Sequence, residues 1–218
     1  MQRHELLKKD LFGEIWRQDY GNQRAILRDA GQARWWLRPV ARMLLRREAR
    51  ALAALDGLHG VPRLFDVGRS TLARSYIDGE SLYRADAPGA GYFRDALRLL
   101  RALHVRGVAH NDLAKEPNLV VTRNGQPAFL DYQLASASRR RGRLFRIAAR
   151  EDLRHLLKHK RTYAPEALTR RQQAMLDTPS LPSWVWMHTV KPVYLFVTRT
   201  LMGWSDREGA GDRGRRDG

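Results

Sequence analysis

The chain has 218 residues, which suits one compact domain or one domain with short appendages. Its hydrophobic fraction of 43% is enough for a core and argues against wholesale disorder. There is no cysteine, which excludes disulfides, cysteine-ligated zinc and a thiol nucleophile. The formal net charge is +17, so we expect attraction to polyanions such as nucleic acid, anionic lipid or phosphorylated glycan.

No targeting or membrane-spanning segment is expected. The N-terminus is polar and leads to no long apolar run, so no signal peptide is predicted. The most apolar stretch, residues 184–204, is interrupted by His188, Lys191, Pro192 and Arg199, whereas a spanning helix needs about 20 mainly apolar residues. Its aromatic side chains suit either a membrane-interface patch or a helix packed in the core, and both interpretations stay open. We therefore expect a cytoplasmic protein, at most peripheral on the inner membrane.

The first third of the chain predicts strands and one helix. Four short stretches are typical of strands: residues 12–17, 24–28, 61–67 and 72–77. The first two flank turn-forming residues at 19–22, which predicts a hairpin. Residues 40–56 have apolar positions at helical spacing and end at Gly57. Asp78 and Gly79 then break the pattern.

Helices dominate the rest of the chain. Three stretches predict helices: residues 92–104, which Gly107 stops, about 148–160, and 166–176. Residues 118–121 and 128–130 predict a second hairpin around Asn124-Gly125. The order of elements predicts an α+β fold with two lobes. The expected parts are an N-lobe (1–79), a C-lobe (80–178), an aromatic and basic segment (179–205) and a disordered tail (206–218).

A group of polar residues suits phosphoryl transfer from ATP. That reaction needs a carboxylate for the acceptor proton, oxygen ligands for Mg²⁺, and a cation for the nucleotide phosphates. His110-Asn111-Asp112-Leu113, with Asn118 and Leu130-Asp131-Tyr132-Gln133 downstream, resembles the catalytic loop and metal-binding strand of the protein-kinase-like superfamily. Within it, the chain looks most like the short bacterial lipopolysaccharide-core sugar kinases and the RIO-type kinases, over roughly residues 10–160.

The resemblance implies a compact, two-lobed, kinase-like fold with ATP and Mg²⁺ as cofactors, a reduced glycine-rich loop and a truncated C-lobe. It assigns catalysis to Asp112 as the base, together with His110 of the same loop. The remaining roles follow by position: Asn118 and Asp131 as metal ligands, Arg28 as the phosphate cation, Glu48 as its partner, and Gly13 as the remaining phosphate-loop glycine. Asp152 stands where a buried aspartate would anchor the catalytic loop backbone.

The chain also departs from the family pattern. Arg28 stands where the family has lysine, and an arginine is not a conservative replacement at a tight phosphate site. Asp112 and Asn118 are six residues apart where five is usual. Tyr132-Gln133 replaces Phe-Gly, so we do not expect this segment to flip between states. Only 20 residues separate Asp131 from Asp152, which leaves no room for a peptide-docking segment.

That short interval contains an arginine run at residues 139–143, followed by Arg146, which favours an anionic acceptor or an anionic membrane surface. The expected function is phosphorylation of a hydroxyl on a sugar or glycolipid, with the lipopolysaccharide core as the substrate that the resemblance implies. The alternatives are a RIO-like serine/threonine protein kinase and a pseudokinase adaptor. Nucleic acid is not an expected partner, because aromatic residues do not interleave the basic run. His155 and His159 are expected on a solvated basic face rather than at a metal.

Overall fold

The structure is a computed structural model that describes residues 4–85 and 88–178. The chain forms two compact units, residues 1–169 and residues 170–218. In the second unit the described element is helix α4 (Arg170–Asp177). The aromatic and basic segment and the tail expected at 179–205 and 206–218 lie outside the described residues. The expected division into lobes near residue 79 stays a prediction.

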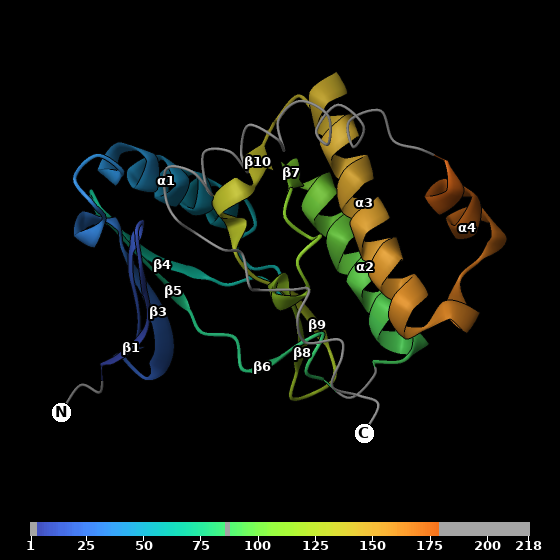
Figure 1. Ribbon diagram of the computed structural model, residues 1–218, viewed down its shortest axis with the longest axis horizontal. Coiled ribbons are helices and arrows are strands. Elements are labelled where there is room, and N and C mark those ends of the chain that lie inside the picture. Colours follow the sequence, from blue (N-terminus) through green and yellow to red (C-terminus); the bar gives the residue numbers. More distant parts are fainter. Residues whose placement is uncertain (1–3, 86–87, 179–218) are drawn as a thin grey trace. The chain divides into compact units, whose positions relative to one another are not determined.

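The first unit is a mixed α+β structure, which confirms the expected class (Figure 1). Its largest sheet is antiparallel with the strand order β1-β2-β3-β5-β4. The strands are β1 (Glu5–Asp10), β2 (Gly13–Tyr20), β3 (Gln23–Asp29), β4 (Leu64–Val67) and β5 (Thr71–Ser75). The four expected strands are present. β1 was not predicted, because all six of its residues are exposed and its sequence shows no apolar alternation.

Helix α1 (Arg38–Ala54) confirms the helix expected over residues 40–56. Pro39 suits its first turn, because the backbone N–H groups there have no partner within the helix. Ala41, Leu45 and Ala49 recur every four residues and form a core cluster with Leu72 of β5. The chain leaves the helix through Gly57, whose φ of +73° lies in the left-handed region.

The rest of the first unit combines short strands with two long helices. The strands are β6 (Gly79–Ser81), β7 (Val108–Ala109), β8 (Leu119–Thr122), β9 (Pro127–Phe129) and β10 (Ser136–Ala137). They form a sheet in the order β6-β8-β9 and a separate pair of β7 with β10. The expected hairpin is therefore present as β8 and β9.

Helices α2 (Ala90–Val105) and α3 (Arg143–Tyr163) pack side by side (Figure 1). α2 confirms the predicted helix, whereas α3 begins five residues earlier than expected. The extension contains Phe145, which is buried with its ring 6.1 Å from the ring of His104. The helix expected over 166–176 is divided instead into a short 3₁₀ helix, η4 (Pro165–Ala167), and α4.

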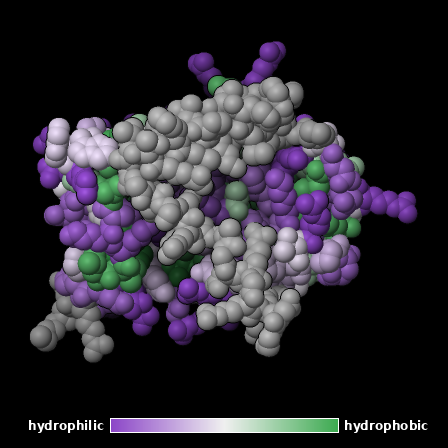
Figure 2. Space-filling model, in the orientation of Figure 1, coloured by the Kyte–Doolittle hydropathy of each residue, from purple (hydrophilic) through white to green (hydrophobic). Residues whose placement is uncertain are grey.

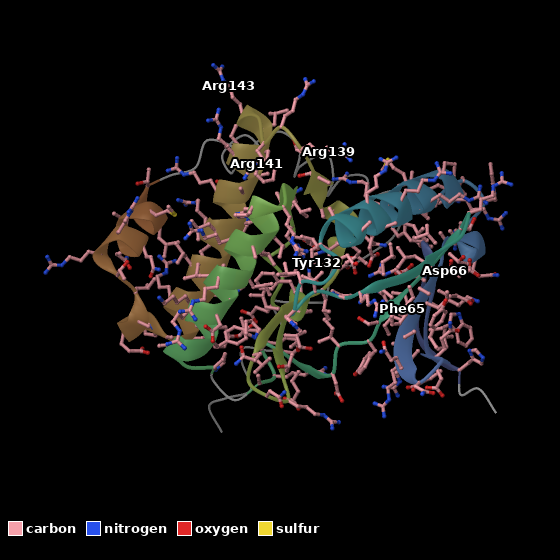
Figure 3. All side chains as sticks on the ribbon, turned by 180° about the vertical axis from the view of Figure 1, so that it is seen from behind. Phe65, Asp66, Tyr132, Arg139, Arg141 and Arg143 are labelled. Carbon is pink, nitrogen blue, oxygen red and sulfur yellow. The ribbon has the colours of Figure 1, made fainter. Side chains whose placement is uncertain are left out.

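A second, larger core cluster combines residues of α2, α3 and the short strands with the last turns of α1. Tyr132 lies in this cluster and is fully buried, in the interior of the first unit (Figure 3). On the face drawn in Figure 2, the described surface is mostly hydrophilic. Within residues 4–85 and 88–178, no helix is both long and apolar enough to cross a membrane.

Candidate active site

A buried carboxylate lies between two arginines on the large sheet. Glu48 projects from the inner face of α1 and is 0% exposed. Its Oε2 lies 3.3 Å from Nε of Arg28, and its Oε1 lies 3.0 Å from Nε of Arg74. The two arginines share one face of the sheet, because Arg28 pairs with Leu72 and Ile26 with Arg74 across β3 and β5. The ion pair expected between Arg28 and Glu48 is therefore present, and Arg74 is an addition that the sequence did not reveal.

Arg28 also reaches Asp131. Its Nη2 lies 3.3 Å from Oδ1 of Asp131, so one guanidinium joins α1 to the segment after β9. Burial acts to lower the pKa of Arg28, but the carboxylates of Glu48 and Asp131 raise it above its ordinary value. Burial likewise acts to raise the pKa of Asp131, but Arg28 and Arg74 bring it below its ordinary value. Both groups are therefore charged at neutral pH.

Asp131 has a backbone conformation that non-glycine residues rarely adopt. Its φ of 62° and ψ of 74° lie in the left-handed region, immediately before the 3₁₀ helix η3 (Tyr132–Leu134). Arg47 of α1 donates through Nη2 to the carbonyl of Leu134 at 2.9 Å, and β10 continues the segment by pairing with β7. These contacts tie the residues after Asp131 to α1 and β7, and the expectation that this segment does not flip stays a prediction.

The candidate catalytic base lies in the loop between β7 and the 3₁₀ helix η2 (Glu116–Asn118). Asp112 is largely buried, and Asn118 Nδ2 donates both to its Oδ2 at 2.9 Å and to its carbonyl at 2.8 Å. Lys115 Nζ lies 3.1 Å from the same Oδ2. A carboxylate oriented in this way can accept a proton from a hydroxyl group placed against it.

Helix α3 holds this loop through Asp152, which is 0% exposed. Its Oδ2 accepts from the backbone N–H of His110 at 2.7 Å, and its Oδ1 accepts from that of Asn111 at 2.8 Å. The second Oδ2 contact is with Nε2 of His104, at 3.2 Å. The expectation that Asp152 anchors the loop backbone is therefore confirmed. Asn111 sits in the left-handed region with a φ of 64°.

His110 connects the loop to the segment that carries Asp131. Its ring is fully buried, 4.6 Å from the ring of Tyr132. Its Nε2 lies 2.9 Å from the carbonyl of Leu130, and because a carbonyl only accepts, Nε2 carries the proton. Burial lowers the pKa of His110 against the opposing charges of Asp152 and Asp112, so the ring is neutral. These contacts give His110 a positioning role. The backbone N–H of Leu130 also donates to the carbonyl of Asn118 at 2.9 Å.

The structure accounts for Gly13 without a phosphate. It begins β2 directly after a tight turn, with a φ of +129°, and a Cβ there would lie 2.1 Å from the carbonyl oxygen of Asp29. A side chain at this position would therefore collide with β3. The turn between β1 and β2 contains only residues 11 and 12, so the loop expected there is very short.

Sequence reasoning also missed His159. We expected it on a solvated basic face, and this expectation is wrong: His159 is buried, and its Nε2 lies 2.8 Å from the carbonyl of Leu113 in the loop that carries Asp112. Arg154 and Lys160 are buried as well. The signal that could have found His159 is its spacing of seven residues from Asp152, which places both on one face of α3.

Asp131 and Asn118 are the residues that could hold Mg²⁺. Oδ1 of Asp131 is buried and makes no hydrogen bond, which leaves it available as a hard oxygen ligand once Arg28 shifts. The described residues contain no cluster of three or more His, Cys, Asp or Glu side chains that could hold a metal. A site of one carboxylate, one amide and substrate phosphates fits the chemistry of Mg²⁺ without such a cluster.

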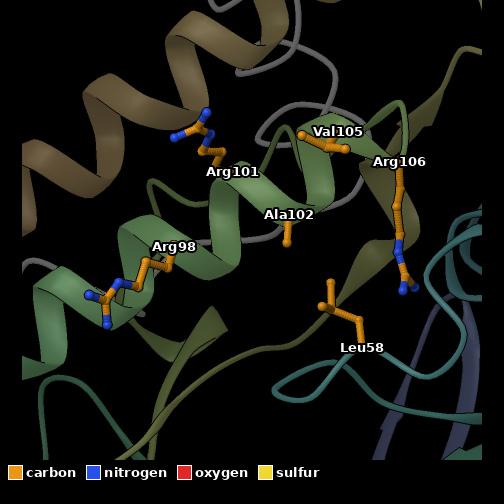
Figure 4. A pocket seen from close by; sticks show the side chains of 6 residues that line it. All are labelled: Leu58, Arg98, Arg101, Ala102, Val105 and Arg106. Carbon is orange, nitrogen blue, oxygen red and sulfur yellow. The ribbon is translucent and has the colours of Figure 1, made fainter.

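Two shallow hollows of about 440 Å³ each lie elsewhere on the described surface. One is bordered by side chains of α2 and by Leu58, as Figure 4 shows. The other lies at the turn between β2 and β3 and includes Phe65. Neither is lined by the site residues described above, so the assignment depends on the polar geometry rather than on a cavity.

Comparisons with known proteins add no relative. No protein-family model matches the chain, and no curated protein is significantly similar to it. A function can therefore be proposed only from the geometry of the side chains described above.

Proposed function

We propose that the chain is an ATP- and Mg²⁺-dependent phosphotransferase with a kinase-like fold, acting on a hydroxyl group of a sugar or glycolipid. The observation that supports this most is Arg28, which contacts both Glu48 of α1 and Asp131. A cation steadied by a helix carboxylate, next to a second carboxylate that could hold a metal, is what nucleotide phosphates and Mg²⁺ need. Asp112 and Asn118 supply a base and an amide through a loop that hydrogen-bonds to the residue before Asp131.

In this mechanism each side chain has one task. Arg28 binds the nucleotide phosphates, and Glu48, which also pairs with Arg74, holds Arg28 by charge. Asp131 and Asn118 would hold Mg²⁺, which when bound neutralises charge on the phosphates. Asp112 accepts the proton of the acceptor hydroxyl as its oxygen bonds to the γ-phosphorus. The bond between that phosphorus and the bridging oxygen breaks, and ADP leaves.

The acceptor class follows from the interval between Asp131 and Asp152. It holds η3, β10 and the start of α3, with exposed arginines at residues 139–141 and 143. Guanidinium groups favour phosphate or carboxylate groups on the acceptor. An anionic sugar or glycolipid at the cytoplasmic face of the membrane fits this charge, and the lipopolysaccharide core is the candidate that the resemblance suggests. A RIO-like protein kinase would use the same residues on a serine or threonine hydroxyl.

A pseudokinase adaptor is the second candidate, and one observation favours it. Arg28 already pairs with Asp131, so metal and nucleotide must displace this ion pair before they bind. If they cannot, the fold would serve only to bind a partner.

The direct test is transfer of labelled γ-phosphate from ATP to a panel of phosphorylated sugars, glycolipids and peptides, with Asp112→Asn alongside. We expect transfer to an anionic sugar or glycolipid, and a loss of roughly 10²–10⁴ in rate in the variant. Asp66→Asn is the matched control, since Asp66 is an exposed residue of β4 (Figure 3). Transfer by Asp112→Asn at the wild-type rate would remove the assigned base, and transfer to peptides alone would favour the RIO-like alternative.

A further inference from the structure

The start of α1 exposes an unusual set of large apolar side chains. Trp35 is 79% exposed, Trp36 45%, Val40 41% and Met43 49%. Trp35 and Trp36 lie in the turn immediately before α1, and Val40 and Met43 lie three residues apart on one face of its first two turns. We call these four residues the α1 patch.

Packing of the fold does not explain the α1 patch. The core cluster beneath this helix is made by Ala41, Leu45 and Ala49, which project from the opposite side, and it contains none of the four residues. Two adjacent indoles left in water are unfavourable for an isolated protein. A contiguous exposed apolar patch of this kind usually marks an interaction surface.

The charges around the α1 patch indicate which kind of partner it binds. Residues 31–54 contain six arginines and one acidic residue, Glu48, which is buried beneath the helix. The side chains of Arg34, Arg46 and Arg50 are exposed and make no hydrogen bond or ion pair with any residue that the structure describes. The outer side of α1 is therefore apolar in its first two turns and cationic further along, where Arg50 follows Met43 by seven residues on the same face.

We infer that the α1 patch docks on an anionic phospholipid bilayer, with the indoles at the level of the headgroups and the arginines on lipid phosphates. Tryptophan favours the membrane interface because one part of its ring is apolar and its N–H is polar. A helix that exposes apolar side chains together with arginines binds anionic lipid by combining buried apolar area with charge attraction. Nucleic acid would be attracted by the arginines but gives no reason for Val40 and Met43 to be exposed.

A second cationic segment adjoins α1. β10 contacts α1, and the arginine run starts two residues after β10. Figure 3 shows Arg139 next to α1 and Arg143 directed away from the body of the unit. α1 also carries Glu48, so docking through α1 would hold the candidate active site at the membrane. This consequence rests on the proposed function, whereas the docking itself does not.

The absence of cysteine allows a clean test on the full chain. Met43→Cys carries a single environment-sensitive fluorophore, and the label is placed at Asn22→Cys as a control. Asn22 lies in the turn at the far end of the seven-residue strand β3, roughly 20 Å from the start of α1. Vesicles contain phosphatidylcholine alone or with about one-third phosphatidylglycerol. We expect a blue-shifted emission, quenched by spin-labelled lipid, for the label at position 43 on anionic vesicles and not at position 22.

Flotation with unlabelled protein tests the same surface. Trp35→Ala with Trp36→Ala should weaken binding by about tenfold, whereas Val67→Ala, an exposed apolar residue on β4, should leave it unchanged. Binding that disappears with salt, without any emission change at position 43, would overturn the inference in favour of charge contact alone. Equal binding by the Trp variant would overturn it as well, as would an emission shift produced by RNA rather than by vesicles. Asp112→Asn should bind vesicles like the wild type, so a failure of membrane docking can be distinguished from a failure of the proposed catalysis.

Discussion

Glu48 is the common ion-pair partner of two largely buried arginines. A fully buried carboxylate is tolerated only when cations compensate for its lost hydration, and here Arg28 and Arg74 both do so. Removing the carboxylate leaves two largely buried guanidinium groups without their common partner. Asp131 compensates Arg28 in part, but Arg74 has no such second ion pair in the described structure.

We predict that Glu48→Ala lowers the free energy of unfolding by about 3–5 kcal/mol, because it leaves buried charge uncompensated. Urea denaturation followed by circular dichroism measures this change. Glu80→Ala, at an exposed residue of β6, is the control and should change stability by no more than about 0.5 kcal/mol. Equal effects of the two substitutions would show that the buried ion pairs do not support the fold.

At the scale of elements, α3 supports the loop that carries Asp112. Asp152 accepts from two backbone N–H groups at the start of the loop, and His159, two turns later, contacts the carbonyl of Leu113 at its end. Residues 110–115 of the loop form neither helix nor strand, and the backbone of Asn111 has a left-handed conformation. Its geometry therefore depends on this helix rather than on its own sequence.

Asp152→Ala should loosen the loop while α3 stays folded. We expect hydrogen exchange of the amides of His110 and Asn111 to accelerate by at least about tenfold, since each loses a charge-assisted acceptor. A peptide covering β3 should exchange as in the wild type. Unchanged protection around residue 110 would mean that other contacts fix the loop.

Elements with a strong local signal could be predicted from the sequence. The β2–β3 and β8–β9 hairpins have turn residues between apolar runs, and α1 and α2 have a clear helical period. β7 and β10 consist of two residues each and are defined only by their pairing with each other, so no local sequence pattern predicts them. The start of α3 was not predicted, because Arg143 and Arg146 flank the buried Phe145 and hide the helical spacing of apolar residues in this first turn.

On the scale of the whole molecule, long-range contacts explain what the sequence could not reveal about the site. Arg74 joins Glu48 only because β5 pairs with β3 in one register, and a shift of a single residue would turn it to the other face. The pairing of Arg28 with Glu48 and the anchoring by Asp152 were predicted from the resemblance to kinase-like proteins. The spacing of His159 from Asp152 indicates a shared face of α3, but its contact with the carbonyl of Leu113 depends on how α3 packs against the loop that carries Asp112.

Burial of histidines across the first unit predicts a pH dependence of stability. Burial lowers the pKa of His110, His155 and His159 below the ordinary value of 6.5. In that case the unfolded chain binds more protons than the folded chain below about pH 6.5, so stability is complete above that pH and is lost as pH falls through the folded pKa values. Each histidine contributes at most about 1.4 kcal/mol per pH unit.

Urea midpoints at about pH 7.5 and about pH 5.5 measure this loss. We expect a lower midpoint at the acid pH and a smaller decrease in His159→Asn, whose amide can still donate to Leu113. A midpoint that rises on acidification would contradict the neutral, buried state of these rings.

Calorimetric titration of the full chain with ATP, with and without Mg²⁺, tests the proposed nucleotide site directly when the wild type is compared with Asp131→Asn. We predict Mg²⁺-dependent binding in the wild type and its loss in the variant, because Asp131 supplies the carboxylate beside Arg28. No binding by the wild type at millimolar ATP, or equal Mg²⁺-dependent binding by both proteins, would contradict a working nucleotide site at Asp131.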